Sequence, residues 1–189
     1  MRVLASAAGG LLLLAWATAA GAESFPDRPI KWIVPYGPGG GSDISARLLA
    51  KILTDKLGQP VIVENKTSAG GVVAAEAVAN AKPDGYTMLF APSGPMGVNP
   101  SLYKKLSYSV KSFKGIHGIA RTPNVYSVNA AAPYKTFKEM VDHARMHTNS
   151  MNYSSVGVGT TYHLAGELLA IGTETRMTHV PYKATSQAI

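Results

Sequence analysis

Short β-rich runs and longer runs with helical spacing alternate along this chain, and that alternation restricts the possible folds more than any other feature. The first pair is a predicted strand over 30–36 and a predicted helix over 44–57, whose apolar residues recur at helical spacing. Strands over 61–64 and 86–91 and a helix over 72–81 follow in the same order. This alternation is typical of an α/β fold with a parallel sheet and crossover helices.

The same alternation returns toward the end of the chain. The predicted elements there are a helix over 136–147, opened by a capping box of Thr136 and Glu139, a strand over 151–155, a helix over 163–171, a strand over 176–182 and the first turn of a helix over 185–189. Between the two series we predict a turn-rich loop over 92–100, a partly helical stretch over 102–109 and strands over 115–120 and 125–129. The chain is therefore predicted to form two lobes, over 23–122 and 123–189.

Residues 1–22 have the layout of a secretory signal peptide. Arg2 supplies a positive start, residues 3–19 are nearly all apolar or small, and Ala20-Gly21-Ala22 fits the small-x-small rule for cleavage. A retained membrane anchor is the alternative, because the apolar stretch approaches the roughly 18 residues that span a bilayer. Gly9 and Gly10 weigh against an anchor, so we expect secretion with cleavage after Ala22.

Charge and cysteine content exclude several classes of function. The net charge is +7, but the basic residues are scattered, only Lys104 and Lys105 are adjacent, and no basic stripe with interleaved aromatic residues occurs. We therefore expect no nucleic-acid partner and a mild attraction for small anions. With no cysteine in the chain, disulfides, thiolate metal sites and a cysteine nucleophile are excluded.

Three glycine-containing loops each lie between a predicted strand and a predicted helix. They span 37–43, 68–71 and 154–161. Backbone N–H groups at the start of a helix attract an anion such as a carboxylate or a phosphate. For a single loop, a tight turn alone would account for the glycines. Three such loops together predict a ligand that is held largely by the main chain.

A nucleotide-dependent α/β enzyme is the main alternative. Glu64 ends the second predicted strand, where a ribose-binding acid of a dinucleotide fold is expected. The glycine spacing argues against that fold, because the third required glycine falls on Ser42 when counted from Gly37 and on Ile44 when counted from Gly39. No Gly-Lys-Ser/Thr sequence closes any of the loops, so a phosphate-binding P-loop is also absent. We expect no cofactor.

Catalytic patterns are weak, and we expect a binding protein rather than an enzyme. Ser93 lacks the flanking residues of a nucleophile elbow. His143 and His147 are four residues apart, but position 144 is alanine rather than the glutamate of a zinc protease, so no metal site is predicted. Asp43 is expected to tie down its own loop through backbone N–H groups, and it or Ser42 is expected to cap the helix that follows. His163 either reaches a bound anion or caps its helix, and these two roles stay open.

A longer series of motifs resembles a known family of receptors. The motifs are Phe25-Pro26-Asp27-Arg28-Pro29-Ile30, Ile33-Val34-Pro35-Tyr36, Pro38-Gly39-Gly40-Gly41-Ser42-Asp43, Gly58-Gln59-Pro60-Val61, Pro83-Asp84-Gly85-Tyr86-Thr87, Asn99-Pro100-Ser101-Leu102-Tyr103, His163-Leu164-Ala165-Gly166-Glu167 and His179-Val180-Pro181-Tyr182-Lys183. In this order they resemble the extracytoplasmic solute receptors of tripartite tricarboxylate transporters, often called the Bug family. The similarity covers residues 25–183 almost continuously.

The resemblance implies a periplasmic-binding-protein-like, two-lobed fold of the Venus-flytrap type (type II). It implies a monomeric periplasmic receptor that closes on a small carboxylate solute, a di- or tricarboxylate or a related anion, and delivers it to the permease subunits of the transporter. By position, the ligand-binding residues are Tyr36, Pro38, Gly39, Gly40, Gly41, Ser42, Asp43, Ser93 and Gly94 from the first lobe and Ser154, Gly157, Gly159, Thr160, Thr161 and His163 from the second.

Length is the main departure from the family pattern. Members of the family run well beyond residue 189, completing the second lobe and returning to the first. The resemblance therefore implies a chain that is shortened at its C-terminus and lacks part of both lobes. A non-functional fragment of such a receptor stays open as an alternative to a working one.

Overall fold

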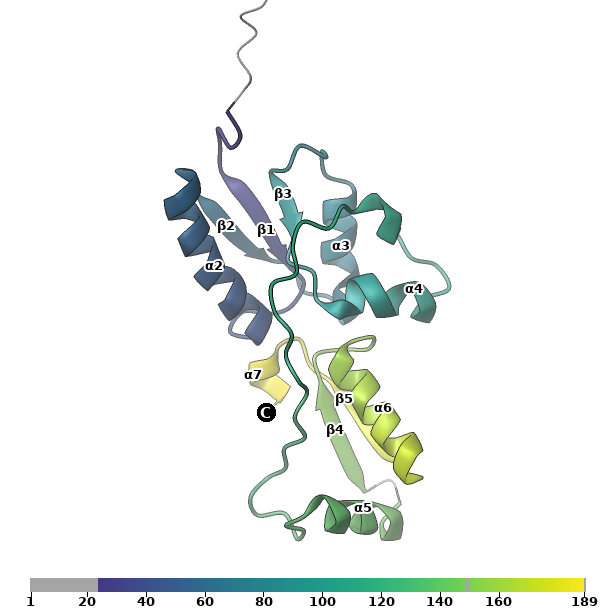
Figure 1. The fold of residues 1–189 in the computed structure, drawn as a ribbon. Helices are drawn as coiled ribbons and strands as arrows, with labels where there is room; N and C mark the ends of the chain where they lie inside the picture. Colours follow the sequence, from purple (N-terminus) through teal and green to yellow (C-terminus); the bar gives the residue numbers. More distant parts are fainter. Residues whose placement is uncertain (1–23, 149, 189) are drawn as a thin grey trace, which may run out of the picture.

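The computed structural model describes residues 24–148 and 150–188, which form two α/β units (Figure 1). The first unit contains a parallel sheet of order β2-β1-β3 and the second contains a parallel pair, β4-β5. The predicted signal peptide and its cleavage after Ala22 lie outside the described residues. Among those residues, no helix combines the length and apolar character that crossing a bilayer requires.

The first unit is built around the central strand β1 (Ile30–Val34). This strand pairs with β2 (Val61–Asn65) on one edge and with β3 (Thr87–Leu89) on the other. Helix α2 (Gly41–Leu57) packs along β2, and helix α3 (Val72–Ala79) packs along β3 (Figure 1). The buried apolar residues of the two helices are small alanines, Ala46 and Ala50 in α2 and Ala74 and Ala75 in α3, which let the helices lie close to the sheet.

The second unit repeats this strand-helix-strand order. Strand β4 (Met151–Ser155), helix α6 (Thr161–Thr173) and strand β5 (Met177–Pro181) form a parallel crossover, with Met151 opposite Met177. Helix α5 (Phe137–Met146) precedes β4, and helix α7 (Thr185–Ala188) follows β5. Thr136 caps α5, because its side chain accepts a hydrogen bond from Glu139 N. The α/β prediction and the order of these five strands are confirmed.

The strands predicted over 115–120 and 125–129 are absent, and those two predictions are wrong. Both stretches belong to the long connection that runs from the first unit to the second (Figure 1). Val125 is 81% exposed and Ile116 is 77% exposed. β-Branched residues favour an extended backbone, but a strand also needs a neighbour for its hydrogen bonds. Within the described residues, no strand pairs with this connection.

The loop predicted over 92–100 is also wrong, because most of it is helical. Gly94–Val98 forms a π-helical turn, η2, and Asn99–Leu102 forms the short helix α4. Tertiary hydrogen bonds hold this segment: the fully buried Asn99 donates from Nδ2 to Gly70 O at 2.8 Å, and Tyr108 donates from its hydroxyl to Pro95 O at 2.6 Å. Local sequence pattern does not report such contacts.

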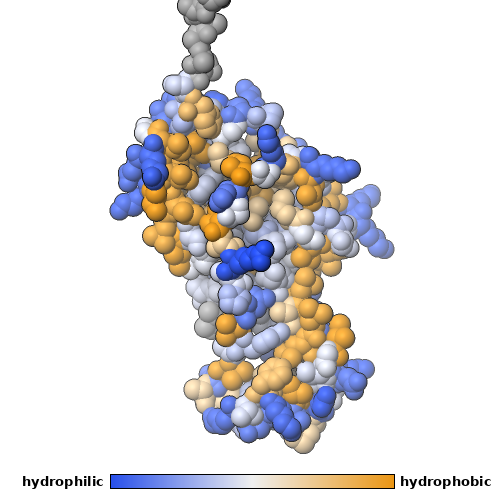
Figure 2. Space-filling model, viewed as in Figure 1, coloured by the Kyte–Doolittle hydropathy of each residue, from blue (hydrophilic) through white to orange (hydrophobic). Residues whose placement is uncertain are grey.

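Apolar side chains reach the surface of both units beside the charged ones (Figure 2). In the second unit, Leu168 and Ile171 of α6 are 68% and 72% exposed. The sheet of this unit has only two strands among the described residues, so it provides little apolar surface for α6 to cover.

Candidate functional site

Asp43 organises the first glycine loop. Its carboxylate, which is 3% exposed, accepts hydrogen bonds from Gly39 N at 2.9 Å, Arg47 Nε at 3.0 Å and Asn65 Nδ2 at 2.9 Å. Burial by itself raises the pKa of this carboxyl, but the hydrogen bonds from Arg47, Gly39 and Asn65 outweigh that effect and hold the pKa below its ordinary value. The expectation that Asp43 ties down its own loop is confirmed.

The same loop presents an uncapped helix start. Helix α2 begins at Gly41, its N-cap is Gly40, and no side chain bonds to the cap, so the prediction that Ser42 or Asp43 caps this helix is wrong. Gly39 has a φ of 78°, in the left-handed region where glycine is favoured. The first turn of a helix leaves N–H groups without intrahelical partners. These groups are the donors that an anion would meet at this loop.

The third glycine loop is held by its own hydroxyl groups. Thr160 donates from Oγ1 to Gly157 O at 2.7 Å and accepts from His163 N at 3.3 Å, which caps α6. Ser155 Oγ accepts from Gly157 N at 3.0 Å. Since Thr160 supplies the cap, the side chain of His163 does not, and one of the two roles left open for His163 is excluded.

Glycines bring the loops of the two units into contact. A Cβ placed at Gly70 would lie 2.7 Å from Val158 O, and one placed at Gly159 would lie 2.7 Å from Asn99 Oδ1. A Cβ at Gly94 would lie 3.1 Å from Gly159 O and 3.2 Å from the Tyr36 hydroxyl. The second and third loops and the start of η2 therefore meet where the units touch, and larger residues would separate them.

The first loop touches the second unit at a different place. Gly37 N donates to Lys183 O at 3.2 Å, and a Cβ at Gly37 would lie 2.8 Å from Ala184 Cβ. A Cβ at Gly40 would lie 3.3 Å from Thr185 Oγ1. The segment that follows β5 is thus the neighbour of the first glycine loop, and sequence reasoning did not include it in the site.

The sequence-predicted site residues differ in exposure. Tyr36, Gly94 and Gly159 lie close together, and burial beside Tyr162 and Tyr108 raises the pKa of the Tyr36 hydroxyl. Ser154 lies apart from them and donates from Oγ to Ala188 O at 2.7 Å. Gly40, Asp43, Gly94, Gly157, Gly159 and Thr160 are buried, Tyr36, Ser42, Thr161 and His163 are half-buried, and Pro38, Gly39, Gly41, Ser93 and Ser154 are exposed.

Behind the third loop lies a polar aromatic cluster that sequence reasoning missed. Tyr153 stacks on His179 with ring centroids 4.9 Å apart, and His163 lies 4.4 Å from His179. The Tyr153 hydroxyl donates to Glu167, and His179 Nε2 lies 2.6 Å from Ser155 Oγ. The i,i+4 spacing of His163 and Glu167 was the available signal. The nearly complete burial of Ser155 and its bond with Gly157 make this pair structural rather than nucleophilic.

Because of this cluster, we expect the second unit to be less stable in acid. Burial, and then the neighbouring His163, lower the pKa of His179 below its ordinary value of 6.5, although Glu167 acts in the opposite direction. The stabilisation that neutral His179 provides is therefore complete above pH 6.5 and is lost as the pH falls through the lowered pKa. We expect the free energy of unfolding, measured in urea, to fall between pH 7.5 and pH 5.5, and to fall less in His179→Gln.

His117, an exposed histidine in the connection, is the matched control. His117→Gln should keep the full acid dependence. An equal dependence in His179→Gln and the unchanged chain would contradict this assignment.

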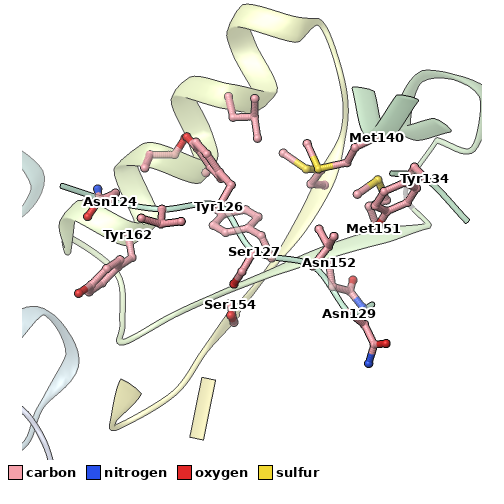
Figure 3. Close-up of a pocket in the computed structure, with 17 residues that line it drawn as sticks. Asn124, Tyr126, Ser127, Asn129, Tyr134, Met140, Met151, Asn152, Ser154 and Tyr162 are labelled. Carbon is pink, nitrogen blue, oxygen red and sulfur yellow. The ribbon is translucent and has the colours of Figure 1, made fainter. Parts of the chain in front are cut away.

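Within the described part of the chain, no three His, Cys, Asp or Glu side chains are grouped closely enough to hold a metal ion. A cavity of about 340 Å³ lies in the second unit between residues 124–129, β4 and α6, and Ser154, at the start of the third glycine loop, is among the residues that line it (Figure 3). The arrangement between the units thus offers backbone donors and hydroxyl groups, a chemistry suited to binding an anion.

The two α/β units, which meet through glycine loops, place this fold in the class of periplasmic solute-binding proteins. Comparisons with known proteins support this class. A Rhodopseudomonas palustris protein solved with adipate, Rpa4515, matches with a TM-score of 0.83 and 32% identity over 87% of this chain and 55% of that chain. MatC from the same organism, solved with bound malate, matches with a TM-score of 0.76 and 31% identity, over 87% of this chain and 56% of that one.

The family model described as the tripartite tricarboxylate transporter family receptor matches residues 45–189, so the chain belongs to this family. One protein of Bordetella pertussis, called the Bordetella relative below, is 38% identical over 95% of this chain and 55% of its own length. BugT of the same organism is 33% identical over 89% of this chain and 52% of its own length. The chain thus spans about half the length of these two proteins. The family and its periplasmic structural neighbours indicate a periplasmic location.

Proposed function

We propose that this chain provides the anion-facing loops of a periplasmic receptor that captures a small carboxylate solute for a tripartite transporter, without catalysis and without a cofactor. The observation that carries the proposal is the meeting of glycine loops from two α/β units, at Gly70, Gly94 and Gly159. The adipate and malate bound to two structural neighbours support the choice of ligand class.

The proposed site uses main-chain donors from both units. The first turn of α2 supplies N–H groups at Gly41 and Ser42, and the loop that contains Gly157 and Gly159 supplies groups from the second unit. The remaining predicted residues from both lobes, Tyr36, Pro38, Gly39, Gly40, Asp43, Ser93, Gly94, Ser154, Thr160, Thr161 and His163, belong to the same proposal. Asp43 acts in it by positioning Gly39, because its carboxylate already accepts bonds within the loop.

Ligand capture would follow from a hinge motion. A carboxylate that contacts both units binds better when they are close, so it shifts the population toward the closed arrangement. We place the lobe boundary at 122/123, within the connection that contains no helix or strand. Export with cleavage after Ala22, a monomeric receptor and delivery to permease subunits complete the proposal.

Binding of dicarboxylates tests this function. The chain, alone and joined to the part of the Bordetella relative that its match leaves uncovered, is titrated with adipate and malate by calorimetry, with NAD as the competing nucleotide ligand. We expect saturable binding of a carboxylate in the joined form and no response to NAD. A flat response of both forms across a broad carboxylate panel would overturn the proposal.

Gly41 provides a variant that separates binding from folding. Nothing lies within 4 Å of a Cβ placed at Gly41, so the Cβ of Gly41→Val meets open space while the side chain shields the first turn of α2. We expect carboxylate affinity to fall at least tenfold, about 1.4 kcal/mol, with an unchanged melting temperature. Gly115→Val, at another open position, is the control and should bind normally.

A further inference from the structure

Two histidines at the end of helix α5 have no part in the proposed solute site. His143 lies in the last turn of α5, and His147, four residues further on, is the C-cap of that helix. Strand β4 runs from this end of the second unit toward the third glycine loop, so the pair lies at the opposite end of β4 from the junction of the two units (Figure 1). Residues at i and i+4 lie on one face of a helix, and two histidines at this spacing hold the zinc of metalloproteases.

The imidazole rings of this pair lie side by side. They are stacked, with ring centroids 4.2 Å apart and planes 26° apart, and the ring of Tyr134 lies 5.4 Å from that of His143. A bond from a metal ion to a histidine nitrogen is about 2.0–2.1 Å long, so two such bonds placed end to end span about 4 Å. One ion can therefore reach a nitrogen of each ring after small rotations of the two side chains.

Hydrogen bonds set the tautomer of one member of the pair. His143 O accepts from the backbone N of His147 at 2.9 Å and from His147 Nδ1 at 3.0 Å. Because a carbonyl oxygen only accepts, Nδ1 of His147 carries a proton, and in the neutral ring Nε2 has the lone pair. Metal-ligating histidines usually donate their second ring N–H in this way, which orients the ring and makes the ligating nitrogen more basic. His147 thus has the tautomer of a metal ligand, with Nε2 as the ligating atom.

The position of the pair at the end of a helix favours a cation. The carbonyl groups of the last turn carry partial negative charge, and α5 ends at Met146, between the two histidines. Both cationic side chains of α5 are bonded to other groups: Lys138 Nζ pairs with Asp142 at 2.6 Å, and Arg145 donates from Nε to Thr173 O at 2.9 Å. A divalent ion at the pair would therefore lie at a helix end that attracts positive charge.

We propose that His143 and His147 form a binding site for a late first-row transition-metal ion, Cu²⁺ or Ni²⁺, on the surface of the second unit. The two imidazole nitrogens occupy neighbouring positions of the tetragonal geometry that these ions favour, and water occupies the others. Mg²⁺ and Ca²⁺ do not compete, because they prefer oxygen ligands. The alanine at position 144 excludes the chemistry of a zinc protease, but it leaves the binding of an ion by the pair intact.

Titration with NiCl₂ tests this site. The chain, without an affinity tag, is titrated by calorimetry, and its midpoint of unfolding in urea is measured with and without Ni²⁺. We expect one saturable site and a midpoint that rises with Ni²⁺, because the ion binds the folded end of α5. MgCl₂ should give no binding heat. Absence of saturable Ni²⁺ binding, or binding that leaves the midpoint unchanged, would refute the proposal.

Single variants assign the ion to the pair. His143→Gln and His147→Gln should each lower the Ni²⁺ affinity at least tenfold and abolish the rise in the urea midpoint. His147 is exposed, so its variant should fold as the unchanged chain does. His117→Gln, at an exposed histidine outside α5, is the matched control and should change neither quantity. Equal Ni²⁺ affinities in His147→Gln and His117→Gln would rule out the pair.

Two further variants, made in the His147→Gln background, test the spacing. Met146→His restores a pair at i and i+3, which also share a helix face, and should recover part of the Ni²⁺ affinity. Arg145→His supplies the same number of histidines at i and i+2, which do not face each other, and should recover none. Both positions are exposed. Equal affinities in these two variants would mean that the ion is bound without regard to the helix face, and the site would then be wrong.

Discussion

Replacing Gly166 with alanine is expected to destabilise the second unit by about 1–3 kcal/mol, the usual range for overpacking a filled site. A Cβ at Gly166 would collide with Cε2 and Cδ2 of the Tyr153 ring. The ring cannot move aside freely, because its hydroxyl bonds to Glu167 and its face stacks on His179. Chemical denaturation of the variant should show the loss as a lower midpoint with an unchanged slope.

The sign of this effect distinguishes packing from helix propensity. In a helix interior, alanine is more favourable than glycine by roughly 0.8–1.0 kcal/mol, so propensity alone predicts that Gly166→Ala is stabilising. Gly172, near the end of the same helix, has nothing within 4 Å of a Cβ. Gly172→Ala should therefore raise the midpoint while Gly166→Ala lowers it. A rise in both variants would show that α6 does not pack on Tyr153.

Asp43→Ala is expected to cost about 2–3 kcal/mol of unfolding free energy, in line with the loss of hydrogen bonds to a charged group. The change removes the acceptor of Gly39 N, Arg47 Nε and Asn65 Nδ2 together. The N–H of Gly39 then loses its partner in a partly buried loop, and Asn65 Nδ2 keeps only its bond to Tyr36 O. Thermal melting of the variant, compared with the unchanged chain at neutral pH, measures the loss.

The pH dependence of this variant provides a second check. The folded-state pKa of Asp43 lies below its ordinary value of 3.8, so the stabilisation is complete above that value and disappears as the pH falls through the folded pKa. The difference between Asp43→Ala and the unchanged chain should therefore shrink in acid. Asp55→Ala, at an exposed position of α2, is the control and should stay within about 0.5 kcal/mol at all pH values.

The sequence predicted the parts of the fold that are governed by local pattern. The strands around Ile30, Val61 and Met151 and the helices that follow them have the expected order, since apolar spacing and glycine turns act over a few residues. The strands over 115–120 and 125–129 were wrong, because pairing depends on a neighbour that local spacing does not encode.

In the candidate site, too, the local features were predictable from the sequence and the long-range contacts were not. The glycine loops and the positioning role of Asp43 follow from residue type and spacing, and Asp43 is bonded as expected. The approach of Gly37 to Lys183 and the stacking of Tyr153 on His179 were not predictable. Both join residues that are far apart in the chain, and neither has a local signature.

The glycines at the junction of the two units have a consequence for how such a receptor is tuned. At Gly37, Gly70 and Gly159, an added methyl group would collide with Ala184, Val158 and Asn99 in the facing unit. The close approach of the two units thus depends on the absence of side chains at these positions. Substitution there would act as a spacer that holds the two units further apart.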